Sequence, residues 1–207
     1  MWKVAQLSAT SFFGKPIMDR RTFIKRLGQG AAMAALPMTG QTANNGMRYL
    51  RPPGSLSEEE FTSQCIRCGQ CSEVCPNRCI QYFGFENGLS SIDTPYIIPR
   101  EKGCILCMKC GDVCPSGAIK SVIREAQAII DNVQMGTARV DTTLCLSFQG
   151  KTCGVCYRSC PLQDVAIKVG MLEQPHVNAD NCVGCGLCER SCIQQPQAIR
   201  IIPEHFG

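Results

Sequence analysis

The sequence lacks most of the features that enzymes and membrane proteins depend on. Aromatic residues make up only 6% of its 207 residues, and no run of about 18 apolar residues is present to span a bilayer. His176 and His205 are the only two histidines and stand far apart. No phosphate-binding glycine motif and no nucleophile paired with a base occur. We therefore expect that the protein has no catalytic site of its own and is not an enzyme.

Excess positive charge is confined to the beginning of the chain. The formal net charge is +4, but the first 43 residues hold six basic residues and one acidic residue, Asp19. The rest of the sequence is close to neutral. No basic stripe remains that could bind a nucleic acid, so we do not expect a nucleic-acid partner.

The same early segment has the form of an export signal. Arg20 and Arg21 are followed by Phe23 and Lys25, and a weakly apolar stretch runs over 28–38. This order predicts a leader over residues 1–43 that the twin-arginine translocase recognises, with a chance basic segment as the alternative. Met18 directly precedes the pair and is a candidate true start. The expected location is the periplasm, where a partner or an uncleaved leader would hold the protein at the membrane.

The abundant residue is cysteine, with 17 copies arranged in four motifs. Motif 1 (65–75), motif 2 (104–114) and motif 4 (182–192) follow the C-x2-C-x2-C-x3-C spacing that bacterial proteins use to hold 4Fe–4S clusters. Motif 3 (145–160) differs, because seven residues separate its first two cysteines. We predict four 4Fe–4S clusters, with iron bound by sixteen residues: Cys65, Cys68, Cys71, Cys75, Cys104, Cys107, Cys110, Cys114, Cys145, Cys153, Cys156, Cys160, Cys182, Cys185, Cys188 and Cys192.

Two other uses of cysteine fit this pattern less well. Exported proteins often form disulfides, but four dense quartets in the same order are a poor disulfide framework and 17 is an odd number. Zinc sites space two C-x2-C pairs widely instead of placing three cysteines within seven residues. The remaining residue, Cys79, aligns with Ala118 of the second repeat, so we interpret it as a small buried side chain and not as a ligand.

The repeats predict an α+β fold of two bacterial-ferredoxin-like modules, in which small antiparallel strands and short helices surround the clusters. A linker is expected over 44–56, followed by one module over 57–120 with motifs 1 and 2 and another over 137–207 with motifs 3 and 4. Ser57 and Glu60 have the spacing of a capping box for a helix that runs toward Cys65. Apolar residues at helical spacing predict a connecting amphipathic helix over 121–136, which covers a cluster pair or, alternatively, docks a partner.

The motifs allow two pairings. In a two-cluster module, three cysteines of one motif and the last cysteine of the other hold each cluster. Short connections favour the sequential pairing of motif 1 with 2 and of motif 3 with 4. A nested pairing of motif 1 with 4 and of motif 2 with 3 is the alternative, and it would place Cys192 beside Cys65, Cys68 and Cys71.

The chain resembles the ferredoxin-type proteins of the NapG/MauM group over about residues 18 to 203. The segments that carry the resemblance are Arg51-Pro-Pro-Gly54, Cys65-Ile-Arg-Cys-Gly-Gln-Cys71, Thr94-Pro95-Tyr96 and, most specifically, Cys145 to Gly150 with Cys153 to Leu162. Motif 2 has the plain ferredoxin spacing, whereas members of the group can have a longer gap before its third cysteine.

Within that group, the chain is most similar to the quinol-linked subunit of periplasmic nitrate reductase systems. The resemblance implies electron transfer from a polytopic membrane iron–sulfur protein that oxidises quinol toward a periplasmic molybdoenzyme, a nitrate reductase, or its cytochrome. Two alternatives remain open: an electron-transfer subunit of another molybdopterin oxidoreductase, and a maturation factor for methylamine dehydrogenase.

Overall fold

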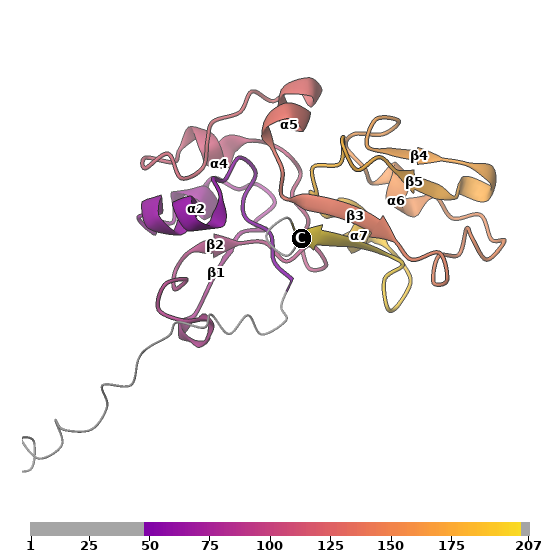
Figure 1. Cartoon of the computed structure of the whole chain (residues 1–207), viewed down its shortest axis with the longest axis horizontal. Coiled ribbons are helices and arrows are strands. Elements are labelled where there is room, and N and C mark those ends of the chain that lie inside the picture. The colour runs from indigo at the N-terminus through magenta and orange to yellow at the C-terminus, as the bar shows by residue number, and fades with distance from the viewer. Residues whose placement is uncertain (1–47, 204–207) are drawn as a thin grey trace, which may run out of the picture. The chain divides into compact units, whose positions relative to one another are not determined.

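The computed structural model describes residues 48–203 and builds them from short helices and two-stranded sheets (Figure 1). The predicted leader, with Arg20, Arg21 and Met18, lies outside the described residues, as do residues 204–207. No helix in the described part of the chain is long and apolar enough to cross a membrane. The α-helices are α2 (Glu58–Gln64), α3 (Gln70–Glu73), α4 (Lys109–Asp112), α5 (Ala126–Asn132), α6 (Val155–Arg158) and α7 (Leu187–Ser191). Two 3-10 turns, η1 (Phe85–Asn87) and η2 (Met171–Glu173), complete the helical elements.

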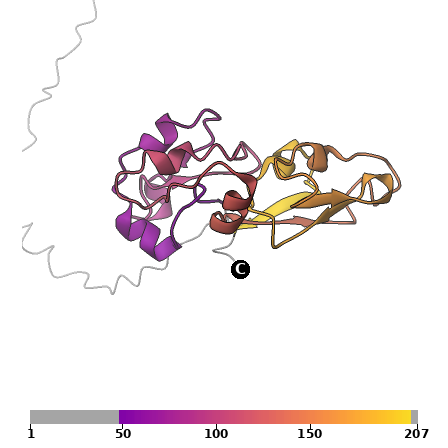
Figure 2. The same cartoon turned by 90° about the horizontal axis from the view of Figure 1, so that it is seen from above.

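Three antiparallel strand pairs join segments that are separated in the sequence. β1 (Gln81–Tyr82) pairs with β2 (Pro95–Tyr96), and β4 (Ile167–Val169) pairs with β5 (Pro175–Val177). The longest pair joins β3 (Gly136–Val140) to β6 (Ile199–Pro203), which lie side by side in both views (Figures 1 and 2). Alternate residues of β6 are buried, as expected for a strand with one face on the core.

The segment expected as a linker is packed structure from residue 48 onward. The backbone of Leu50 exchanges two hydrogen bonds of 2.8 Å with Ile97, and Ser55 forms an antiparallel bridge with Ile119. Leu50 and Pro52 are almost completely buried. In the sequence, the paired prolines indicated a linker. In the structure, this segment packs against the core.

The helix predicted to run toward Cys65 is present as α2, with Ser57 at its N-cap. The predicted capping box is not formed as expected. The Ser57 hydroxyl donates to the Glu60 carboxylate (2.9 Å) and makes no bond with the helix backbone. The helix begins with a backbone hydrogen bond from the Phe61 N–H to the Ser57 carbonyl, at 2.7 Å.

The connecting helix predicted over 121–136 is shorter, because only α5, residues Ala126–Asn132, is helical. The chain before it is not helical: the Lys120 N–H bonds the Gly54 carbonyl at 2.8 Å, Val122 is buried, and the Glu125 N–H bonds the Ile123 carbonyl at 2.8 Å. Ile129 of α5 and Val133 after it are buried as the pattern predicted. Pairing with the segment around Gly54 therefore overrides the helical periodicity at 121–125.

A buried arginine anchors the packed segment. Arg51 is 6% exposed and pairs with the carboxylate of Glu58, with an Nε–Oε2 distance of 2.8 Å. Its Nη1 donates to Thr94 Oγ1 (3.0 Å) and to the Pro95 carbonyl (2.7 Å). The guanidinium also lies over the ring of Phe61, 4.7 Å from the centroid. Arg51 thus ties together α2, β2 and the chain before them.

Replacing Arg51 should therefore weaken the fold. Arg51→Ala leaves the buried Thr94 hydroxyl and Pro95 carbonyl without their donor, so we expect a loss of about 3 kcal/mol. The thermal unfolding midpoint of cluster-loaded protein, followed by circular dichroism without oxygen, should fall by roughly 10 °C. Arg124→Ala is the matched control, because Arg124 is exposed. Equal shifts for the two variants would show that Arg51 is not an anchor.

Candidate functional site

The described cysteines line four separate cavities. Each cavity takes the first three cysteines of one motif and the last cysteine of another, and one cavity holds a fifth cysteine, Cys79. The sets are Cys65, Cys68, Cys71 and Cys114; Cys75, Cys79, Cys104, Cys107 and Cys110; Cys145, Cys153, Cys156 and Cys192; and Cys160, Cys182, Cys185 and Cys188. We name them cavities 1, 2, 3 and 4 after the motif that contributes three cysteines.

This grouping is the one that sequential pairing predicts. Cys192 lies with Cys145, Cys153 and Cys156 and not with the cysteines of motif 1. Contacts between helices agree, because α3 packs on α4 and α6 packs on α7. The nested alternative does not match the structure.

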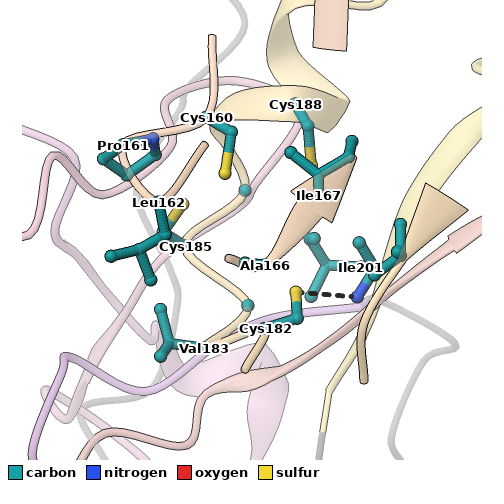
Figure 3. A pocket seen from close by; sticks show the side chains of 14 residues that line it. Cys160, Pro161, Leu162, Ala166, Ile167, Cys182, Val183, Cys185, Cys188 and Ile201 are labelled. Atoms are coloured by element: carbon teal, nitrogen blue, oxygen red, sulfur yellow. Dashed lines mark hydrogen bonds between the residues drawn. The ribbon is translucent and has the colours of Figure 1, made fainter. Parts of the chain in front are cut away.

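Cavity 4 shows how the thiols face one another (Figure 3). Cys160 enters from one side, and Cys182, Cys185 and Cys188 approach from the others, with their sulfurs directed into a common space. Pro161, Leu162, Ala166, Ile167, Val183 and Ile201 supply apolar walls. The lining is therefore almost entirely sulfur and hydrocarbon.

A repeated backbone conformation wraps the loops around these spaces. The residue after the second cysteine of each motif is left-handed and begins a short helix: Gly69, Met108, Gly154 and Gly186. Motifs 1, 2 and 4 also have a left-handed residue just before that cysteine, at Arg67, Leu106 and Gly184. Motif 3 lacks this second left-handed residue, which accords with its longer first gap.

Backbone amides point at several sulfurs. The N–H groups of Leu106, Ile119 and Ala138 donate to the Sγ atoms of Cys104, Cys114 and Cys182, each at 3.4 Å. The last of these is the dashed contact in Figure 3. Such N–H···S bonds stabilise a thiolate and are typical of the surroundings of iron–sulfur clusters.

The thiols would resist ionisation without a cation. Burial raises the pKa of Cys71 to about 11, and it raises the pKa values of Cys110 and Cys185 to about 12. Burial also raises the pKa of Cys188 well above its ordinary value. Several thiolates in one such cavity would need a compensating positive charge, which a bound metal can supply. Among residues 48–203, no group of three or more His, Cys, Asp or Glu side chains is placed to hold a single metal ion. The thiols instead line the walls of the four cavities.

Cavities 2 and 4 adjoin through the backbone. The N–H of Cys104 donates to the carbonyl of Cys185 at 2.7 Å. A Cβ atom on Gly103 would lie 2.7 Å from the backbone nitrogen of Leu187. Close approach at this point therefore requires glycine at position 103.

Two residues that the motifs did not assign to a site, Cys79 and Tyr82, line cavities 2 and 1. Cys79 is buried as expected, but its Sγ lies 3.6 Å from that of Cys75, inside cavity 2. A hydrogen bond from the Cys104 side chain lowers the pKa of Cys79 to about 7. Tyr82 lines cavity 1, and its hydroxyl donates to the Gly69 carbonyl at 2.9 Å. No spacing rule points to a tyrosine seven residues beyond its motif.

Comparison with known proteins identifies similar sequences. Residues 64–118, which include motifs 1 and 2, match the model of a 4Fe-4S dicluster domain. The chain is 39% identical to the ferredoxin-type protein NapG of Escherichia coli (strain K12), over 91% of this chain and 87% of the relative. It is 33% identical to the methylamine utilization ferredoxin-type protein MauM of Methylobacillus flagellatus, over 96% and 89%. A NapG of Haemophilus influenzae is 36% identical, over 89% and 72%.

Proposed function

The chain belongs to the NapG/MauM family of ferredoxin-type iron–sulfur proteins, and from this premise we propose that it carries electrons in the periplasm on four 4Fe–4S clusters. The observation that supports four clusters is the set of four cavities, each with three cysteines of one motif and the last of another. The predicted ligands are the sixteen motif cysteines, and Cys79 is left over.

The residues of each cavity fit such a group. Thiolates supply the iron ligands, N–H donors face three of the sulfurs, and apolar side chains exclude water. When bound, a 4Fe–4S cluster accepts and releases single electrons at a potential that its hydrogen bonds and solvent exposure adjust. Because four cysteines serve each cluster, no iron is left for substrate. We infer a carrier and not an enzyme.

The resemblance to the quinol-linked branch of the family supports a direction for the electrons. We propose that a polytopic membrane iron–sulfur protein that oxidises quinol supplies them, and that a periplasmic nitrate reductase or its cytochrome receives them. Methylamine metabolism is the second candidate, because several relatives at 33–36% identity are named methylamine utilization proteins. An electron-transfer role beside another molybdopterin oxidoreductase would use the same cavities.

Metal content tests the cavities directly. Protein purified without oxygen should contain close to sixteen irons and sixteen acid-labile sulfides, about four of each per cavity. Cys68→Ser should lower both, because Cys68 is one of the four thiols in cavity 1. Iron and sulfide assays with electron paramagnetic resonance of the reduced protein provide the measurement. A folded protein that holds zinc, or only two clusters after full reconstitution, would contradict the proposal.

Export can be tested at the arginine pair. Changing Arg20 and Arg21 together to lysine should leave cluster-loaded protein in the cytoplasm, since the translocase recognises the two guanidinium groups. Immunoblots of periplasmic and cytoplasmic fractions measure the distribution. Arg26→Lys is the control, because it changes a basic residue outside the pair and downstream of Met18. Undiminished periplasmic accumulation of the double lysine variant would remove the twin-arginine assignment.

Electron delivery separates the candidate acceptors. Chemically reduced, cluster-loaded protein should be reoxidised when periplasmic nitrate reductase, its cytochrome and nitrate are added without oxygen. Methylamine dehydrogenase, added in its oxidised form, serves as the comparison. Recovery of the iron–sulfur absorbance follows the reaction. If nitrate reductase and its cytochrome leave the protein reduced, the proposed nitrate acceptor is wrong.

A further inference from the structure

One position lines all four cavities besides the cysteine ligands. It is the first residue of an apolar pair that follows the last cysteine of each motif. Three cavities have alanine there, Ala118 in cavity 1, Ala166 in cavity 4 and Ala198 in cavity 3. Cavity 2 has Cys79. The substitution places a fifth thiol where the other cavities have only a methyl group.

Cavities 1 and 2 form this corner with the same turn. In cavity 2, Arg78 has a left-handed backbone, and its N–H bonds the Cys75 carbonyl at 3.1 Å. In cavity 1, Gly117 is left-handed at the matching place, and its N–H bonds the Cys114 carbonyl at 3.4 Å. Cys79 and Ala118 therefore occupy equivalent positions. Each cavity can serve as the control for the other.

The fifth thiol has the placement that a ligand requires. Cys79 is 2% exposed, and its Sγ lies 3.6 Å from Cys75 Sγ. A hydrogen bond from the Asn77 side chain to the Gly103 carbonyl, at 2.6 Å, fixes the turn between the two cysteines against motif 2. Both thiols therefore border the same corner of the cavity.

From this geometry we infer that Cys79 is an interchangeable ligand of the cluster in cavity 2, able to replace Cys75. The inference rests on the proposed function, because it presupposes iron in that cavity. In the exchange, the bond from iron to Cys75 Sγ breaks and a bond from iron to Cys79 Sγ forms. The proton of the Cys79 thiol moves to the Cys75 sulfur. No electron is transferred, and no other reactant is needed.

Matched ligand deletions test the inference. Cys75→Ala should keep close to sixteen irons, because Cys79 completes the set. Cys114→Ala should lose at least one iron, because Ala118 offers no sulfur. Cys75→Ala combined with Cys79→Ala should lose iron as Cys114→Ala does, whereas Cys79→Ala alone should keep all sixteen. Iron and sulfide counts and the electron paramagnetic resonance of the reduced clusters are the measurements.

A transplanted thiol supplies the reciprocal test. Cys114→Ala combined with Ala118→Cys should regain the iron that Cys114→Ala loses. The inference is overturned if Cys75→Ala loses as much iron as Cys114→Ala, or if Cys75→Ala fails to accumulate under conditions where Cys114→Ala accumulates. Failure of the proposed function has a different signature, because the unaltered protein would then lack the sixteen irons.

Discussion

Thiols buried in apolar cavities are the constraint on which the rest of this structure depends. Burial raises the pKa values of these thiols, so several thiolates in one cavity require a compensating positive charge. Iron bound within the cavities would supply both that charge and covalent cross-links between distant segments. The described α-helices are only four to seven residues long and the strands two to five, so they contribute little stability alone. Metal binding and folding are therefore expected to be coupled.

The cysteine pattern could be interpreted from the sequence because its spacing is local. Three cysteines within seven residues fix a tight loop whatever surrounds it, and the structure groups them with the distant fourth cysteine as the sequential pairing predicted. Small antiparallel strands were expected, and the pairs β3–β6 and β4–β5 are present beside motifs 3 and 4. The packing of α3 on α4 and of α6 on α7 agrees with the same pairing of motif 1 with 2 and of motif 3 with 4.

Features that depend on distant partners could not be predicted in the same way. Arg51-Pro52-Pro53-Gly54 has the composition of a spacer, yet Arg51 is held by Glu58, Thr94 and Pro95. Residues 121–125 have helical periodicity, but they are not helical where the chain leaves the hydrogen bond between Lys120 and Gly54. Cys79 aligned with an alanine, and only the three-dimensional turn shows that its sulfur lies beside Cys75. In each case a contact made after the chain folds decides the outcome.

The pairing of β3 with β6 has a consequence for the timing of folding. These strands begin at residues 136 and 199, so the five-residue ladder between them closes a long stretch of chain that includes all of motifs 3 and 4. During synthesis, β3 has no partner until residue 203 has left the ribosome. Cavities 3 and 4 therefore acquire their final enclosure only after translation of this segment, since such non-local pairing is late and slow. Maturation factors that insert iron would meet an open, accessible form of these two cavities first.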